Sequence, residues 1–504
     1  MAICQKTEYM KKKILFIIWS FSYGGGAEAL LTMIVNHLDP QKYEIGILEY
    51  YHAEIKKEPI HETITYLGAI TFAGDAEGRK KYYYLLNEPS RMISRYIPQD
   101  YDLYIAFNYQ IPCFLLPPGK RCIAWIHSDI YDLQSPAMAK YLMLQNQAFQ
   151  KVQTIVSISD LTTKSLQELC PAHADKLLEI YNGVDTEQIR KKAAEYTAIR
   201  LQHPNLLFAG RLEKRKNPMR LVHILDLLHQ RGKRIHLYYL GQGELQTEIR
   251  EAAEWRGLGG YVHFTGYLQN PYPVMAQCDV NCLLSESEGF SISLLEGTAL
   301  GKPFVSSRIG GAMILSAGGS CGTVTETDIQ AAEAVADWLE RDRDKIREDC
   351  ATCIKRFALP GYINRIEALL DTVLSAPVRI SSSYVYDPDA ELDEPAYYYQ
   401  FPSEYIHMEE KMILYGAGIV GTDYWRFLQK THYCELVAWV DREYETWQKE
   451  GKRVLPITAV QGVRYDRILI ANANKKTADI IRGDLEQLGV PGEKIVWVQP
   501  DYIG

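Results

Sequence analysis

The sequence has no long apolar run, and none of its stretches approaches the roughly 18 consecutive apolar residues that a membrane-spanning helix needs. The apolar stretch Ile14–Trp19 follows Lys11–Lys13, an order that also occurs in signal peptides. It is too short for one, and a glycine-rich loop follows where a small-residue cleavage site would stand. We therefore interpret Ile14–Trp19 as a first buried strand. We expect a cytoplasmic protein, with the inner face of the membrane as a second candidate location.

The sequence also lacks a positive net charge and a paired cysteine motif. Its formal net charge is −8, which gives no general attraction to nucleic acid, so we expect no nucleic-acid partner. Ten cysteines are spread along the chain, and Cys350-x-x-Cys353 has zinc-like spacing without a second pair. This pattern favours free thiols in a reducing compartment over a metal site, and no metal is predicted.

Strand-like and helix-like segments alternate over the 504 residues, enough for about three domains of ~150 residues. The alternation predicts an α/β protein with doubly wound parallel sheets. We predict an N-terminal domain at 1–195, a second domain at 196–374, a linker at 375–409 and a small third domain at 410–504. The expected strands are Ile14–Trp19, Tyr43–Leu48, Leu103–Phe107, Cys122–Ile126, Thr154–Ile158, Leu177–Tyr181, Asn205–Ala209, Ile235–Leu240, Val262–Thr265, Cys278–Leu284, Phe304–Val305, Met412–Tyr415, Leu436–Val440 and Arg467–Asn472.

The stretch Ser285–Ser307 places a polar loop before an amphipathic helix, which Gly301 and Pro303 end. Glu288 is thereby expected on a strand-to-helix turn, and Glu296 two helical turns inside. A helix N-terminus offers unpaired N–H groups and a positive dipole end to a phosphate. A carboxylate accepts two hydroxyl hydrogen bonds from a sugar. The spacing suits a sugar nucleotide, although a surface helix with two ordinary glutamates has the same pattern.

The order Glu288-Gly-Phe, Leu-Leu-Glu296-Gly and Gly-Lys-Pro resembles the Glu-x7-Glu motif of retaining glycosyltransferases of family four, which have the GT-B fold. The resemblance covers roughly residues 13–372 and implies two Rossmann-like domains that face a cleft. It implies that Glu288 orients the transferred sugar and Glu296 the ribose. The adjoining donor-binding candidates are Gly289, Phe290 and Ser291.

The same resemblance implies a reaction. A sugar moves from a nucleoside diphosphate sugar, with a UDP-sugar as the first candidate, to a hydroxyl of a saccharide or lipid-linked saccharide. The transfer needs no metal and no cofactor, and it retains the configuration of the anomeric carbon.

A basic loop follows the expected strand Asn205–Ala209 and contains Arg211 and Lys216. An arginine fork and a lysine point charge suit a diphosphate, whereas a solvated basic loop is the alternative. By the resemblance, Arg211 and Lys216 stabilise the diphosphate as it leaves, although Lys214 or Arg215 could take the place of Lys216.

Two later turns resemble the loops around the nucleotide base in the same family. They make Gly241, Gly243 and Leu268 donor-binding candidates, with ordinary strand-end turns as the alternative. The chain departs from the family after Gly310-Gly311, where a glutamate usually follows and this sequence reads Ala-Met-Ile-Leu-Ser.

In the N-terminal domain, the candidate site residues are a glycine loop, Gly24–Gly26, and a histidine, His127. His127 ends an expected strand, where an imidazole can donate a hydrogen bond to a sugar or take part in proton transfer; a satisfied edge histidine is the alternative. The loop opens a helix and permits close backbone approach. The glycine loop resembles the family's Gly-Gly-x-Glu loop, which faces the acceptor and the donor phosphates. The alternative is that its glycines serve only the turn. Its glycines are Gly24, Gly25 and Gly26.

The third domain carries a Gly-x-Gly-x-x-Gly loop at Gly416, Gly418 and Gly421, between a strand and a helix, with Asp441 further on. This fingerprint predicts a nucleotide site, with Asp441 on a ribose; a structural or docking role is the alternative. The domain resembles the small Rossmann-like modules appended to bacterial polysaccharide-biosynthesis enzymes, which implies a role in surface polysaccharide assembly.

Two other functions fit the same architecture. A GT-B epimerase would alter a nucleotide sugar without an acceptor, and a non-catalytic sensor would read nucleotide sugars through the third domain. The basic and aromatic run Arg79–Tyr84 is a candidate contact for an anionic lipid-linked acceptor at the membrane surface, with a solvated helix face as the alternative.

Overall fold

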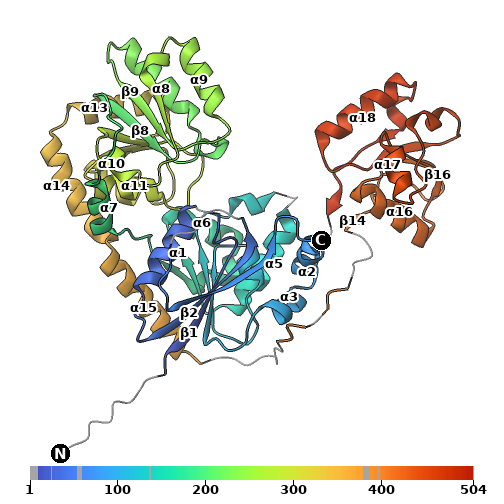
Figure 1. Cartoon of the computed structure of the whole chain (residues 1–504), viewed down its shortest axis with the longest axis horizontal. Helices are drawn as coiled ribbons and strands as arrows, with labels where there is room; N and C mark the ends of the chain where they lie inside the picture. The colour runs from blue at the N-terminus through green and yellow to red at the C-terminus, as the bar shows by residue number, and fades with distance from the viewer. Residues whose placement is uncertain are drawn as a thin grey trace, which may run out of the picture. The chain divides into compact units, whose positions relative to one another are not determined.

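The computed structural model describes residues 10–23, 25–53, 59–135, 138–377, 386–389, 391–393 and 398–502 (Figure 1). Gly24, one of the donor-binding candidates, lies outside these residues. The chain forms two compact units. The larger contains Met1–Ala73 and Ile97–Tyr386, and the smaller contains Gly74–Tyr96 and Asp387–Gly504.

The first sheet of the larger unit has parallel strands in the order β3-β2-β1-β4-β5-β6-β7. The central residues Ile14 to Ile18 are at most 2% exposed, because helices cover both faces of a parallel sheet. In Figure 1, α1 and α5 lie on either side of these strands. The strands are β1 (Lys12–Ile18), β2 (Tyr43–His52), β3 (Ile64–Phe72), β4 (Leu103–Phe107), β5 (Cys122–Ile126), β6 (Thr154–Ser157) and β7 (Leu177–Glu179). The α-helices are α1 (Gly26–His37), α4 (Ile111–Phe114), α5 (Ala139–Lys151), α6 (Asp160–Leu169) and α7 (Thr186–Ala193).

The second sheet of the larger unit is also parallel, in the order β10-β9-β8-β11-β12-β13. Its strands are β8 (Asn205–Ala209), β9 (His236–Leu240), β10 (Val262–Gly266), β11 (Val280–Leu283), β12 (Phe304–Ser306) and β13 (Gly322–Val324). Its α-helices are α8 (Met219–Gln230), α9 (Gln246–Trp255), α10 (Tyr272–Met275), α11 (Ile292–Ala299), α12 (Ala312–Leu315), α13 (Asp328–Glu340) and α14 (Arg343–Ile354).

Helix α15 (Leu359–Ser375) returns the chain from the second sheet to the first (Figure 1). At this crossing the Val184 N–H donates to the carbonyl of Phe357, and the Leu359 N–H donates to the carbonyl of Val184. Further along the helix, the hydroxyl of Tyr43 donates to Asp371 at 2.9 Å. The chain therefore passes between the two sheets twice, and both passages are held together by backbone hydrogen bonds.

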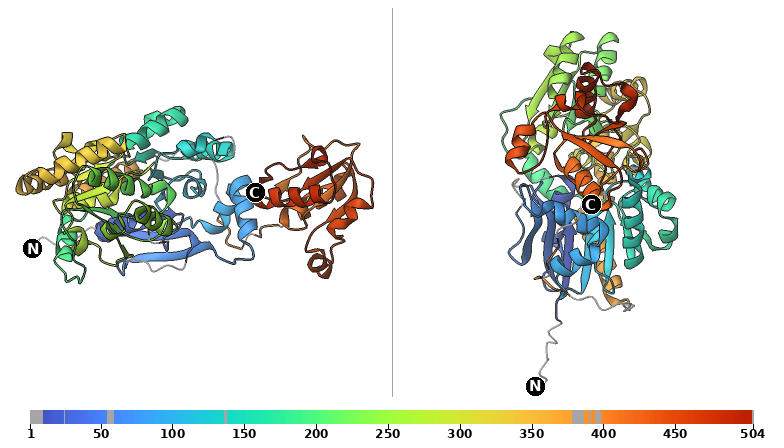
Figure 2. Two further views of the ribbon diagram at one scale, coloured as in Figure 1. Left: turned by 90° about the horizontal axis from the view of Figure 1, so that it is seen from above. Right: turned by 90° about the vertical axis from the view of Figure 1, so that its right-hand side faces the viewer.

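The smaller unit has a four-stranded parallel sheet in the order β16-β15-β17-β18. Helix α16 packs on one face with Met412 and Leu414, and α18 packs on the other with Ile413 and Tyr415 (Figure 2). The strands of this sheet are β15 (Lys411–Tyr415), β16 (Glu435–Val440), β17 (Arg467–Ile470) and β18 (Ile495–Val496). Its helices are α16 (Ile419–Thr431), α17 (Tyr444–Lys449) and α18 (Lys475–Gln487).

Two helices from early in the chain, α2 (Gly78–Asn87) and α3 (Pro89–Tyr96), belong to the same smaller unit. The ring of Tyr82 stacks on Tyr502 with centroids 5.9 Å apart, and the Tyr84 hydroxyl donates to the carbonyl of Asp393. Residue 502 itself lies on β19 (Asp501–Tyr502), which pairs with β14 (Tyr399–Gln400). The run 79–84 is thus helical. Its residues Tyr82 and Tyr84 contact Tyr502 and Asp393, so these two tyrosines do not form a fully solvated face.

The prediction of an α/β protein with two large parallel sheets and a third small one is confirmed. The domain limits drawn from the sequence remain predictions. No helix among the described residues combines the length and apolarity needed to cross a bilayer.

Candidate functional site

Glu288 lies in the loop between β11 and α11, where its carboxylate is almost completely buried. The Lys216 ammonium forms an ion pair with Glu288 Oε1, and the Ser285 hydroxyl donates to the same oxygen at 2.9 Å. The Glu288 side chain is 10% exposed. A carboxylate that is buried and paired in this way is held in one orientation. Within the described part of the chain, its second oxygen has no hydrogen-bond partner that would compete with a ligand hydroxyl.

The loop after β8 supplies the cations. The Glu286 N–H donates to the carbonyl of Arg215 at 2.9 Å, which ties this loop to the Glu288 loop. Lys216 is the residue of the basic run that reaches Glu288. Arg211 points elsewhere: its Nη1 donates to the hydroxyl of Tyr23 at 3.0 Å and lies 3.4 Å from Glu213.

Gly289, next to Glu288, lies against the backbone that follows β5. A Cβ at this residue would lie 1.9 Å from the backbone oxygen of His127, so the backbone has no space for a side chain there. On the same side, the Ser287 hydroxyl donates to Asp129 at 2.5 Å. The loop that carries Glu288 therefore rests on the loop that follows β5.

His127 lies at the end of β5, as the sequence predicts, with its ring 4.0 Å from that of Phe107. Burial lowers the pKa of His127 to about 3, so the imidazole is neutral at physiological pH. Its buried Nε2 has no hydrogen-bond partner among the described residues. Since buried polar groups are usually satisfied, this nitrogen is available to a bound molecule.

Glu296 lies inside α11 and has a different partner from Glu288. The Tyr272 hydroxyl donates to its Oε1 at 2.8 Å, and burial raises the pKa of Glu296 to about 7. Ser291 caps the same helix by accepting from the Leu294 N–H, and Phe290 beside it is buried against Tyr181.

Glycines Gly241 and Gly243 let the turn after β9 pack against the loop after β8. Gly241 has φ +136°, and a Cβ there would lie 2.0 Å from the Gly210 oxygen. A Cβ at Gly243 would lie 2.5 Å from the Leu212 oxygen. Leu268 is partly buried in a small apolar cluster of this sheet. These residues thus give shape to the basic loop, and nothing in their contacts assigns them a base.

The start of α1 adjoins the start of α11. Gly25 is the N-cap of α1, and a Cβ at Gly26 would lie 3.7 Å from the Ile292 side chain. The Glu28 carboxylate folds back over Gly25, and burial raises its pKa while the charge of Arg211 lowers it. Two helix N-termini therefore border the region that contains Arg211.

In the smaller unit, the predicted glycine loop packs tightly on itself. A Cβ at Gly421 would lie 1.9 Å from the Gly416 oxygen, whereas one at Gly418 would meet no atom within 4 Å. One Asp441 oxygen accepts from the Ala417 N–H at 2.7 Å. Asp441, which the sequence predicts to bind a ribose, thus also holds the glycine loop in place.

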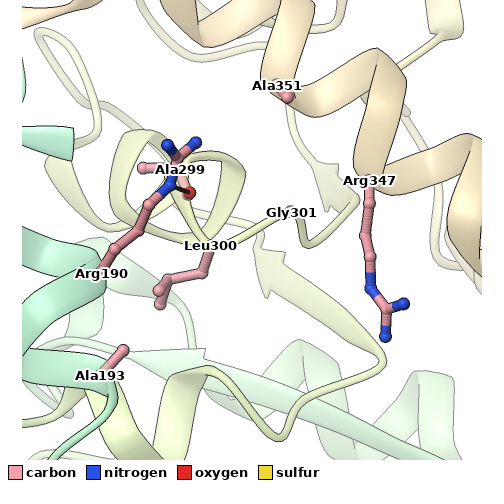
Figure 3. Close-up of a pocket in the computed structure, with 7 residues that line it drawn as sticks. All are labelled: Arg190, Ala193, Ala299, Leu300, Gly301, Arg347 and Ala351. Atoms are coloured by element: carbon pink, nitrogen blue, oxygen red, sulfur yellow. Dashed lines mark hydrogen bonds between the residues drawn. The ribbon is translucent and has the colours of Figure 1, made fainter. Parts of the chain in front are cut away.

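A separate hollow lies at the far end of α11 (Figure 3). There the Arg190 Nε donates to the carbonyl of Ala299, which caps the helix C-terminus, and Arg347 comes from α14. It contains none of the residues that the sequence assigned to catalysis or donor binding. Among the described residues, no three His, Cys, Asp or Glu side chains gather as a metal-ligand set.

Sequence reasoning missed the partners of the site. Tyr23 and Asp129 act across loops that are far apart in the chain, and no local pattern marks them; Ser285 lies three residues from Glu288 in the same loop. The buried Glu49, which belongs to the same region, lies in the apolar strand β2 and gives no periodic signal.

Comparisons with known proteins agree with this architecture. Residues 189–356 match the family described as "Glycosyl transferases group 1", residues 24–188 match "Glycosyltransferase Family 4", and residues 408–496 match "C2185-like, N-terminal". The larger unit therefore contains glycosyltransferase group 1 and family 4 domains.

Solved structures show the fold. Anabaena HepE in complex with UDP covers 71% of this chain and 100% of its own at 18% identity, with a TM-score of 0.55. WaaG, a glycosyltransferase involved in lipopolysaccharide biosynthesis, covers 71% and 99% at 16% identity, with a TM-score of 0.54. The predicted GT-B fold of the larger unit is thereby confirmed.

Two curated relatives are named for sugar transfer. O-antigen chain mannosyltransferase C of Escherichia coli is 30% identical over 42% of this chain and 58% of its own. A Campylobacter jejuni N-acetylgalactosaminyltransferase, named for a diphospho-undecaprenol acceptor, is 36% identical over 24% of this chain and 32% of its own. The chain thus spans less than two thirds of the length of either relative.

Proposed function

We propose that the protein is a retaining glycosyltransferase. It transfers a sugar from a nucleoside diphosphate sugar, with a UDP-sugar as the first candidate, to a hydroxyl of a saccharide or lipid-linked saccharide. The transfer proceeds without a metal ion, and it serves bacterial surface polysaccharide biosynthesis at the inner face of the membrane.

The observation that carries the proposal is the set of positive groups beside one buried carboxylate. Lys216 pairs with Glu288, the charge of Arg211 acts on Glu28, and the N-termini of α1 and α11 adjoin each other. Unpaired N–H groups at helix starts attract phosphate, and an arginine fork binds it bidentately. In the reaction, these groups stabilise the charge that develops on the diphosphate as the glycosidic bond breaks.

The carboxylates and the histidine take the remaining roles. Glu288 accepts hydroxyl hydrogen bonds from the transferred sugar, and Glu296 accepts from the ribose diol. His127, neutral because of its low pKa, uses its free Nε2 as a hydrogen-bond partner of the sugar or of the attacking hydroxyl. Its pKa rules out a stored imidazolium as the acid at neutral pH.

The comparisons support the choice of substrates. A structural neighbour is a complex with UDP and glucose, which favours a UDP-sugar donor. A curated relative is named for an acceptor on diphospho-undecaprenol, which favours a lipid-linked saccharide. We also propose that the loop Gly416–Gly421 with Asp441 binds a nucleotide in the smaller unit.

The test uses the purified full-length chain, a panel of UDP-sugars and an undecaprenyl-diphosphate-linked saccharide. Glu288→Gln is expected to lower kcat by about a hundredfold or more, as the loss of one well-placed polar contact does elsewhere. Glu286→Gln is the matched control, because Glu286 is exposed in the same loop. Transfer by Glu288→Gln at the wild-type rate would exclude the proposed role. An altered nucleotide sugar formed without acceptor would point to the epimerase.

A further inference from the structure

Glu49, at the end of β2, is a charged residue with no exposed surface. Its Oε2 accepts from the backbone N–H of Phe21 at 2.6 Å, from that of Ser22 at 3.0 Å and from the Ser22 hydroxyl at 3.1 Å. A buried carboxylate is costly unless such donors surround it. One oxygen of Glu49 thus holds the turn that follows β1.

The other oxygen of Glu49 is held independently of that turn. The His52 ring nitrogen Nδ1 lies 2.6 Å from Oε1, and the Tyr66 hydroxyl donates to the same atom. The Ser22 hydroxyl also accepts from the Ala53 N–H at 2.7 Å. The carboxylate is therefore fixed from β2 and β3 and presents one oxygen to the turn.

The held turn ends at Tyr23, which is 45% exposed. The Arg211 guanidinium lies 5.4 Å from the centre of the Tyr23 ring and donates to its hydroxyl at 3.0 Å. The Arg211 guanidinium also forms an ion pair with Glu213 at 3.4 Å. A planar guanidinium that stacks on a ring keeps further donors free for a phosphate.

We propose that Glu49 is a positioning residue for donor binding: it fixes the turn so that Tyr23 stacks on Arg211 and aims the guanidinium at the donor diphosphate. The proposal rests on the proposed function. A half-exposed arginine loses much side-chain entropy when it binds a ligand, and a group that is already oriented loses less. The Glu49 carboxylate thus acts on the donor through Tyr23 and Arg211 and does not contact the donor itself.

The test is UDP affinity of the full-length chain, measured by calorimetry. Tyr23→Ala is expected to weaken UDP binding about three- to tenfold, since it removes the stacking and the orientation. Tyr23→Phe keeps the ring and is expected to lose less. Glu49→Gln is expected to weaken binding in the same direction as Tyr23→Ala, because it replaces the charged oxygen that accepts from both N–H groups with a neutral, weaker acceptor.

The decisive variant is Glu49→Gln combined with Tyr23→Ala. If Glu49 acts through Tyr23, the double variant binds UDP no more weakly than either single variant. A purely structural role for Glu49 would make the two effects multiply, and that result overturns the proposal. The comparison variant is Tyr66→Phe, which removes a donor to the oxygen that does not face the turn; it is expected to weaken UDP binding less than Glu49→Gln does.

Four further outcomes separate the failure of this inference from the failure of the proposed function. A folded Glu49→Gln with wild-type UDP affinity overturns the inference, and if that variant does not fold, unchanged affinity in Tyr23→Ala does so. If the wild type binds no nucleoside diphosphate, the proposed function itself fails. If the wild type binds UDP and Arg211→Ala abolishes binding while Glu49→Gln leaves it intact, only the inference falls.

Discussion

Replacing Glu296 by glutamine is expected to make the protein more stable at high pH and worse at binding its donor. The carboxyl group is partly buried inside α11 and accepts one hydrogen bond, from the Tyr272 hydroxyl. A glutamine oxygen can accept the same bond, so the substitution removes the charge and little else.

The magnitude follows from the pKa of Glu296, which burial raises from 4.5 to about 7. The unfolded chain loses its proton first, so the free energy of unfolding falls as the pH rises from about 4.5 to about 7. A difference of about 2.5 between the two pKa values corresponds to at most roughly 3 kcal/mol. Below this window the charge is absent from both states, and above it the full cost persists.

The assay is thermal unfolding of wild type and Glu296→Gln from pH 4 to pH 8. The melting temperature of the variant relative to wild type is expected to rise across the window by up to about 6–12 °C, at 2–4 °C per kcal/mol for a domain of this size. UDP affinity should fall in the same variant, since the amide is a poorer partner for a ribose diol.

A melting-temperature difference that stays constant with pH would refute this reasoning, because it would show that Glu296 is ionised as readily in the folded protein as in the unfolded chain. The control is Glu251→Gln, an exposed glutamate on α9 of the same domain. It reports the general effect of removing one negative charge.

Three other changes test the site. Arg211→Ala is expected to weaken UDP binding about ten- to a hundredfold in calorimetry, the loss of a charged hydrogen bond, whereas Arg231→Ala, at the far end of α8, should not. Gly289→Ala should lower transfer activity strongly, since its Cβ would lie 1.9 Å from a backbone oxygen, while Gly260→Ala meets no atom within 4 Å; equal activity of the two variants would count against the close approach. Because His127 is neutral above a pKa of about 3, His127→Gln should lower kcat without moving the pH profile between pH 5 and 8.

The strands that the sequence predicts well are buried on both faces. The expected strands Leu103–Phe107, Cys122–Ile126 and Asn205–Ala209 match β4, β5 and β8 residue for residue, because a continuous apolar run marks a central parallel strand. The edge strands β3 and β13 were missed. Strand β3 mixes buried and exposed positions and contains Gly68 with φ +98°, so it lacks an unbroken buried apolar run.

The sequence predicts those residues of the candidate site that lie within one short stretch of the chain. Glu288 and Glu296 could be found because one loop and one helix carry both. That Lys216 pairs with Glu288, and that the Tyr272 hydroxyl binds Glu296, depends on contacts between loops distant in sequence. The raised pKa of Glu296 also follows from packing, which composition and spacing do not encode.

The discontinuity of the smaller unit has a consequence for how the chain is made. Helix α2 leaves the ribosome early, yet the groups that contact it, Asp393 and Tyr502, are added 309 residues or more after their partners on α2. Until then the tyrosines of α2 lack these partners. A deletion that removes Asp393 or Tyr502 would therefore leave α2 without these partners, although α2 lies in the N-terminal half of the chain. The packing of α2 thus depends on the synthesis of residues much later in the sequence.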